Sequence, residues 1–456
     1  MAALSISSPG GGRSRVVLHR EAWLSIALGL AIIGAMISYP METAIAVIIV
    51  AAFVVFLLFN TWYAVILLLV ARSSLDLLAD VAVVSSLNGA ALLTAAMVAV
   101  GFDHIARNRI RVFDLPLTKP FLALLLVSAF TIAMAPDIRL AFEHWIRLLS
   151  TFLLFTLIVS ELHARPWERY RLLGAVLLSA VIPLIFGLFQ LATNGGDQAT
   201  EGFNRIYGTF VHPSPYGVYL LTLLPLAAVV WFHQKPGWLK LALGLLAILL
   251  LVSSLFTFTR IVWVGLLVGV LVMASIKARA ALLVIPIIVV AAIYLLPSVQ
   301  DRFEGATQTT GYESSGAWRI RHWDDQLATT SPSTLPFGSG LGAVEYVLGQ
   351  PAHNDYLRIW VELGLFGSIA SIWLYGSLAK NALASYRDSP SRFDKSLIVA
   401  FLAMFSARLV MSLTDNLLIQ PVLEWYFWAI AAMTVAVSIP TRRPAPLTSP
   451  GYRVRP

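Results

Sequence analysis

Long apolar segments separated by short polar ones run along most of the chain. A helix rises about 1.5 Å per residue, so roughly 20 apolar residues cross a bilayer core about 30 Å thick. About fourteen segments have this character, over approximately residues 22–38, 43–59, 62–79, 84–101, 117–134, 146–161, 172–192, 215–232, 239–256, 261–276, 280–297, 356–379, 396–413 and 421–438. Charged residues interrupt the pair 62–79 and 84–101 at Arg72, Asp76 and Asp80, but the apolar runs are otherwise continuous, whereas barrel strands alternate over about 10 residues. We therefore predict an all-α, polytopic transmembrane bundle of about 12–14 spans.

The stretch 239–276 is apolar but too long for one span. A straight helix of that length would measure about 57 Å, nearly twice the hydrocarbon thickness. Polar residues from Ser253 to Arg260 mark the expected turn. Arg260 there is either an arginine that extends to lipid headgroups or a fixed cation that binds a lipid phosphate, which a guanidinium group matches bidentately.

The composition places the whole chain in the membrane class. Of 456 residues, 58% are hydrophobic and 12% are charged, against about 25% charged in ordinary soluble domains. So few charges cannot coat several soluble domains. The absence of cysteine excludes disulfides, thiolate metal sites and cysteine nucleophiles.

The basic residues indicate topology rather than nucleic-acid binding, because they lie in short pieces between apolar runs. When the N-terminus is placed in the cytoplasm and the sides alternate, 22 of the 32 Lys and Arg residues fall on the inner side. This bias predicts that both termini are cytoplasmic. The chain then divides into a disordered tail (1–20), N-terminal transmembrane helices (21–192), a transmembrane region (193–438) and a second tail (439–456).

Three outer segments stand out in this topology, around 193–214, 298–354 and Thr414–Gln420. Loops longer than about 15 residues are usually functional or disordered. The long loop 298–354 carries Trp318, Arg319, Arg321, Trp323 and His353, and we expect it to fold against the bundle.

Two motifs in this loop could carry chemistry. Indoles beside arginines around Arg319 suit an interfacial anchor, or sugar stacking beside a diphosphate. We do not expect Asp324 and Asp325 to bind a metal, because adjacent side chains on a helix point apart. His353, in His353-Asn354-Asp355-Tyr356-Leu357, is either a cap or a group for proton transfer, since histidine titrates with a pKa of about 6.5.

These elements, taken in order, resemble the bacterial O-antigen ligase and polysaccharide polymerase superfamily of membrane glycosyltransferases. The resemblance covers about residues 205–430. The matching pieces are Arg205 to Phe210 before Pro213, the Thr-Phe-Thr-Arg turn at Arg260, Arg319 with Trp323, Gly338-Ser339-Gly340-Leu341-Gly342, the His353-Asn354 motif and Asp415-Asn416. His212 and Ser214 depart from the usual pattern, which has asparagines there. We expect the glycines of 338–342 to form a tight bend.

The resemblance implies a GT-C-like protein of the bacterial inner membrane with its active site on the periplasmic face. It would transfer a glycan from an undecaprenyl-diphosphate carrier to a lipid A core or glycan acceptor, without a metal or other cofactor. By this resemblance His353, Arg260 and Arg319 would be catalytic. The further candidates for substrate binding are Arg205, Arg321, Asn354, Tyr356 and Asp415.

A transporter or flippase of lipid-linked glycans is the alternative hypothesis, and it would place polar groups near the middle of the bilayer. The candidate groups gather instead at one predicted boundary. The expected partners are thus the lipid-linked donor, the acceptor and membrane lipids, with no nucleic acid. Whether the chain is a ligase or a polymerase stays open.

Overall fold

A computed structural model of the chain describes residues 60–75, 82–84, 87–198, 204–277, 282 and 315–438. The chain divides into two units, Met1–Asn60 and Thr61–Pro456, and all elements below belong to the second. Its α-helices are α3 (Thr61–Arg72), α4 (Gly89–Asn108), α5 (Thr118–Ile132), α6 (Ile138–Ala164), α7 (Glu168–Leu178), α8 (Val181–Ala192), α9 (Pro213–His233), α10 (Trp238–Phe256), α11 (Arg260–Lys277), α14 (Ser315–Ala328), α15 (Ala343–Leu348), α16 (Asp355–Asp388), α17 (Arg392–Met411) and α18 (Pro421–Ser438). A 3-10 helix, η2 (Val112–Asp114), joins α4 to α5.

The predicted helical class is confirmed for the described residues, with two small additions. β1 (Ala82–Val84) pairs with β2 (Leu87–Asn88), and β3 (Asp197–Gln198) pairs with β4 (Asn204–Arg205), both antiparallel. Six helical segments are long and apolar enough to cross a membrane: Ile138–Ala164, Glu168–Ala192, Pro213–His233, Trp238–Phe256, Arg260–Lys277 and Asp355–Asp388. The chain is therefore a multi-pass membrane protein. The predicted segments 22–38, 43–59 and 280–297 and the tails 1–20 and 439–456 lie outside the described residues, apart from residue 282.

Three predicted spans differ from the structure. In the segment 62–79, helix α3 ends at Arg72 and residues 76–79 lie outside the described residues, and in the segment 84–101 helix α4 begins at Gly89. Arg72 is buried with its guanidinium 6.0 Å from the Trp425 ring, so this charge meets an aromatic partner inside the bundle. The segment 172–192 is divided into α7 and α8 at Ser179 and Ala180, because Pro183 has no N–H to donate to the Ser179 carbonyl and its ring crowds that carbonyl.

The turn predicted within 239–276 is confirmed. Helix α10 ends at Phe256 and α11 begins at Arg260, so only Thr257, Phe258 and Thr259 connect them. Phe258 has a φ of 45°, in the left-handed region, which reverses the chain in few residues. The turn places Arg260 at the very start of a membrane-spanning helix.

Helix α16 is broken at Gly364, whose φ of 64° and ψ of −157° are not helical. The loop before it supplies the missing hydrogen bonds: Ser339 N donates to the Val361 carbonyl (2.8 Å), and Leu365 N donates to the Leu335 carbonyl (2.9 Å). A Cβ on Gly338 would lie 2.3 Å from the Glu362 carbonyl carbon, so only glycine fits. The tight bend expected at 338–342 is confirmed, and it fixes the end of the long loop onto α16.

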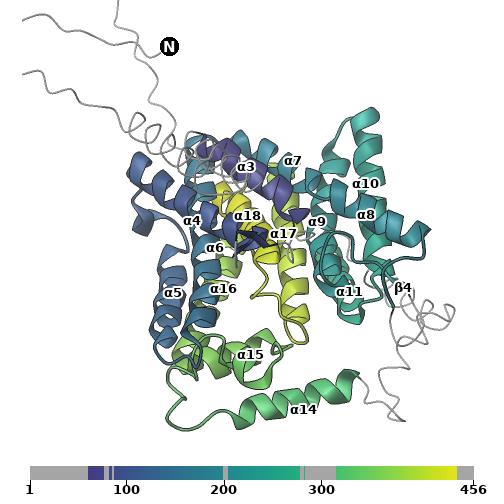
Figure 1. The fold of residues 1–456 in the computed structure, drawn as a ribbon. Coiled ribbons are helices and arrows are strands. Elements are labelled where there is room, and N and C mark those ends of the chain that lie inside the picture. The colour runs from purple at the N-terminus through teal and green to yellow at the C-terminus, as the bar shows by residue number, and fades with distance from the viewer. Residues whose placement is uncertain are drawn as a thin grey trace, which may run out of the picture. The chain divides into compact units, whose positions relative to one another are not determined.

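Helix α14, in the described part of the long loop, is joined by hydrogen bonds to the segment just before α16. Figure 1 shows α14 and α15 at one end of the helical bundle and α3 and α7 at the other. His322 on α14 contacts the Pro351 carbonyl (2.9 Å), and Gln326 donates to the Ala352 carbonyl (2.8 Å). The loop is thereby held close to the start of α16, where His353 lies.

Candidate active site

A polar cavity of about 650 Å³ lies at the α14 end of the helices. Its walls come from the starts of α9 and α11, from α14, from the segment before α16 and from the turn between α17 and α18. Five of the residues predicted from the sequence line it: Arg205, Arg260, Arg319, His353 and Asp415. Elements far apart in the chain thus bring three cations and one imidazole to a single space.

Arg205 is held by the turn between α10 and α11. Its guanidinium donates to the Thr257 carbonyl (3.1 Å) and to the Thr259 hydroxyl (3.1 Å). It also lies 3.7 Å from the Asp197 carboxylate. These contacts fix β4 beside the N-terminus of α11, so Arg205 and Arg260 belong to one rigid corner of the cavity.

Arg260 is the first residue of α11, and Pro213 is the first residue of α9. Both helix starts line the cavity. The N-terminus of a helix carries a partial positive charge and unsatisfied N–H groups, which favour anions. The side-chain cations and the helix starts therefore give the cavity the same sign of charge.

Arg319 enters from α14 beside an aromatic wall. The Trp318 ring stacks on the His322 ring with centroids 4.9 Å apart, and it lies at 77° to the His353 ring with centroids 5.3 Å apart. A flat indole next to cations is a surface on which a sugar ring can lie. Trp318 itself lines the cavity.

The conformation of His353 is set from the turn between α17 and α18. His353 has a φ of 51°, and its backbone N–H donates to Asn416 Oδ1 (2.7 Å). Such a left-handed conformation is rare for histidine and persists only when its surroundings hold it. The imidazole is half-buried at the edge of the cavity.

The electrostatics keep this imidazole neutral. Burial lowers the pKa of His353, and Arg319 and two neighbouring histidines lower it further, while Asp415 acts in the opposite direction. A neutral imidazole at neutral pH can accept a proton. Burial and the charge of Arg205 also lower the pKa of His212, on the far side of the cavity.

Asp355 fixes the turn that holds His353. Its carboxylate, only 1% exposed, accepts hydrogen bonds from the Ser412 hydroxyl (3.0 Å) and from the Leu417 backbone N–H (2.9 Å). Its own backbone N–H donates to the Ser412 carbonyl (2.9 Å). Asp415, on the same turn, accepts a hydrogen bond from the Ser214 hydroxyl at the start of α9. The turn therefore joins α16, α17 and α9 around the cavity.

Three predicted residues do not line the cavity. Arg321 is exposed on α14. The Asn354 side chain caps α16 by accepting from the N–H groups of Tyr356 (3.1 Å) and Leu357 (3.0 Å). Tyr356 donates its hydroxyl to the Leu409 carbonyl (2.7 Å) and lines a different groove.

Several lining residues were not among the predicted site residues. His212 and Ser214 were noted only as departures from the family pattern, and Asn416 only as the neighbour of Asp415. A buried ion pair between Arg408 on α17 and Glu424 on α18 was also not predicted. The available signal for this pair was a charge inside an apolar helix, which is unusual in membrane proteins.

Comparison with known proteins gives one match. Residues 245–372 match a family model described as O-Antigen ligase. The matched residues include Arg260, Arg319 and His353, whereas Arg205 and Asp415 lie outside them. No curated protein matches the chain.

Proposed function

We propose, from its membership of the O-antigen ligase and polymerase family, that this chain is a membrane glycosyltransferase that moves a glycan from an undecaprenyl-diphosphate carrier to an acceptor hydroxyl. The active site is the cavity of Arg205, Arg260, Arg319, His353 and Asp415, and it faces the periplasm of a bacterial inner membrane. The observation that carries the proposal is that these cations and a neutral imidazole line one cavity.

The reaction is a substitution at the anomeric carbon of the donor glycan. The acceptor oxygen forms a bond to this carbon as the bond from the carbon to the diphosphate oxygen breaks. The electron pair of the broken bond leaves with the diphosphate. The hydroxyl proton passes to the imidazole of His353, whose lowered pKa leaves it unprotonated before the reaction.

The arginines stabilise the leaving group. Negative charge on the diphosphate oxygens grows as the bond breaks, so fixed cations bind the transition state more tightly than the ground state. Guanidinium groups stay protonated and form paired hydrogen bonds with phosphate oxygens. Three such groups supply the positive charge that a divalent metal provides in other transferases, and we expect transfer to continue in the presence of a chelator.

The test is a transfer assay with purified protein in lipid nanodiscs. A labelled undecaprenyl-diphosphate glycan is supplied with lipid A core or with a second lipid-linked glycan, with and without a chelator. The proposal predicts a new glycosidic bond and release of undecaprenyl diphosphate. Movement of the intact donor across a vesicle bilayer, with no new bond, would instead support the transporter hypothesis.

A further inference from the structure

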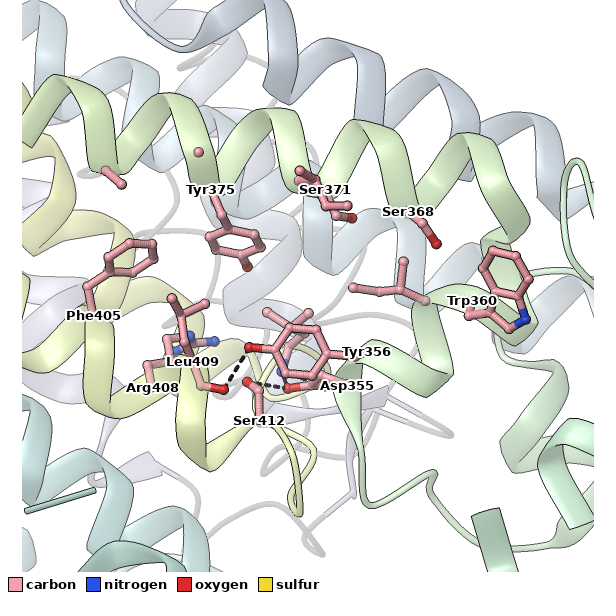
Figure 2. Close-up of a pocket in the computed structure, with 15 residues that line it drawn as sticks. Asp355, Tyr356, Trp360, Ser368, Ser371, Tyr375, Phe405, Arg408, Leu409 and Ser412 are labelled. Carbon is pink, nitrogen blue, oxygen red and sulfur yellow. Dashed lines mark hydrogen bonds between the residues drawn. The ribbon is translucent and has the colours of Figure 1, made fainter. Parts of the chain in front are cut away.

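We propose that the groove between α16 and α17 binds the hydrocarbon chain of a polyprenyl-linked acceptor, so that both substrates of the transfer carry a polyprenyl chain. The inference rests on the proposed function and deepens it, because it selects a lipid-linked glycan rather than a lipid A core as the acceptor. The groove has a volume of about 550 Å³. Figure 2 shows its lining, with Ser371 and Tyr375 on α16 and Phe405 and Leu409 on α17.

Several polar side chains along this groove already have partners, whereas the buried Ser371 hydroxyl has none among the described residues. The Tyr356 hydroxyl donates to the Leu409 carbonyl (2.7 Å), and the Ser412 hydroxyl donates to Asp355 (3.0 Å), as the dashed lines in Figure 2 mark. Ser368 donates to the Gly364 carbonyl (2.9 Å), and Arg408 is paired with Glu424. With these groups satisfied, the groove offers mainly carbon surfaces to its occupant. A hydrocarbon chain fits that chemistry, whereas a sugar or a phosphate does not.

A glycine keeps the groove open. Gly376 lies within α16 and lines the groove, and a Cβ built on it would meet nothing within 4 Å. Glycine is unfavourable inside a helix, and here neither close packing nor an unusual φ requires it. We infer that the absence of a side chain at Gly376 keeps the groove wide enough for an occupant.

The dimensions suit one chain that enters from one leaflet. The lining of the long part of α16 runs from Ser368 to Ala379. At 1.5 Å per residue this is about 17 Å, roughly half of a hydrocarbon core of about 30 Å. Two helices wall the groove, which leaves room for a single polyprenyl chain but not for the several acyl chains of lipid A side by side.

The groove approaches the cavity on the side of the base. Asp355 and Tyr356, at its end, follow His353 directly in the chain. The residues at the turn after α17 alternate between the two spaces, because Ser412 and Leu418 line the groove while Asp415 and Asn416 line the cavity. A lipid in the groove thus presents its head group beside His353, where the proposed mechanism places the acceptor hydroxyl.

The donor has a separate position on another face of α17. Ala403, Met404 and Ala407 line a smaller apolar groove, of about 180 Å³, together with α9 and α11. Val270 on α11 lines this second groove, and α11 begins at Arg260 in the cavity. A chain there places its diphosphate toward the arginines. The groove between α16 and α17 therefore takes the acceptor lipid, and the smaller groove beside α11 takes the donor lipid.

The experiment uses substrates that can play only one role. The donor is blocked at its acceptor hydroxyl, and the acceptor carries a phosphonate in place of the anomeric C–O–P linkage, so it cannot donate. The variant Gly376→Leu fills the α16–α17 groove with a side chain that has room for its Cβ. The same acceptor glycan without a lipid serves as the comparison substrate.

We expect Gly376→Leu to raise KM for the lipid-linked acceptor about tenfold or more, because the leucine displaces chain carbons from apolar contact. KM for the donor and for the lipid-free acceptor should stay at the wild-type values. Val270→Phe should show the reverse pattern, with a higher KM for the donor only. Gly174→Leu is the matched control, because Gly174 on α7 also has nothing within 4 Å of a Cβ and lines neither groove.

A second readout does not depend on turnover. A polyprenyl-linked acceptor that carries a photoreactive group on its chain should label peptides from Ser368–Ala379, and Gly376→Leu should remove this labelling. The inference would be overturned if Gly376→Leu left both the acceptor KM and the labelling unchanged, or if it raised the KM of the donor alone. It would also be overturned if the wild-type protein transferred glycan efficiently to lipid A core and Gly376→Leu impaired that transfer to the same extent. If the wild-type protein transfers glycan to no acceptor at all, the proposed function itself fails.

Discussion

A polar cavity lies at each end of α16, and the two differ in the charge that lines them. The cavity at the start of α16 contains Arg205, Arg260 and Arg319 and one carboxylate, Asp415. The cavity at its other end, of about 780 Å³, contains one arginine, Arg111, and the carboxylates Asp114, Glu161 and Asp388. The second is larger and equally polar, so size alone does not identify an active site.

The histidines of the two cavities differ in the same way. His104 at the second cavity contacts the Ser160 hydroxyl (2.9 Å) and lies 3.7 Å from Glu161. Glu161 is itself paired with Arg165. His353 at the first cavity has Asp415 and Arg319 among its charged neighbours, and its backbone is held in an unusual conformation. Only the first cavity combines excess positive charge with a neutral imidazole, as transfer from a diphosphate requires.

The largest expected effect is that of His353→Ala. Removal of a general base costs about 10²–10⁴-fold in rate, so transfer should be abolished in a routine assay. Folding and membrane insertion should be intact, because the side chain is only half-buried. His163 lines the other cavity beside His104, and His163→Ala should leave kcat near the wild-type value. Wild-type-like turnover of His353→Ala would reject its role as the base.

Arg260→Ala should reduce kcat nearly as much. Loss of one preorganised group that stabilises developing charge costs about 10²–10³-fold. Arg111→Ala is the matched control, since it removes an arginine from the cavity at the other end of α16. Equal losses in the two variants would remove the distinction between the cavities, and the comparison of the two rate constants is the measurement.

Asn416→Ala should give a smaller loss, in kcat rather than in KM. One hydrogen bond is worth about 1 kcal/mol, or somewhat less than a tenfold change in rate. Without Asn416 Oδ1, the His353 backbone loses the partner that holds its left-handed conformation. Asn416→Asp keeps an acceptor oxygen at this position and should recover part of the activity. A purely structural role would lower the yield of folded protein without this difference between the two variants.

The smallest effect should appear in the pH profile. Protonation of His353 removes the base, and the lowered pKa of His353 places the acid limb of kcat below about pH 6.5. Arg319→Gln removes a positive charge that opposes protonation, so the pKa of His353 should rise. The acid limb should then move to higher pH by less than about one pH unit, because a single partly solvated charge has a modest effect. The shape of the profile is compared after each curve is scaled to its own maximum. A limb that stays in place would show that Arg319 does not act on His353.

The helices could be predicted because their sequence signal is local. From 117–134 to 421–438, each predicted apolar segment contains a helix, apart from 280–297, which lies outside the described residues except for residue 282. The break at Gly364 could not be predicted, because it depends on hydrogen bonds with the distant loop around Ser339. The strands could not be predicted, because each is too short to leave a periodic pattern in the sequence.

The lining of the cavity could be predicted where one residue type carries the signal, as for Arg260 and His353, but not where helix geometry decides. Arg319 and Arg321 are two residues apart on α14, so they point to nearly opposite faces, and only Arg319 lines the cavity. Asn354 and Tyr356 are neighbours of His353 in sequence. At the start of α16, however, the Asn354 side chain caps the helix and the Tyr356 hydroxyl donates to a carbonyl of α17. Asn416 contacts His353 only through the fold.

The central claim is that the arginine cavity holds the diphosphate of the donor. Its most direct measurement is the binding of undecaprenyl diphosphate, in nanodiscs, to the wild-type protein and to the triple variant Arg205→Gln, Arg260→Gln and Arg319→Gln, with Arg111→Gln as the control. The account predicts that the triple variant loses nearly all specific binding while the control binds as the wild type does. A triple variant that binds the diphosphate lipid with wild-type affinity would contradict it.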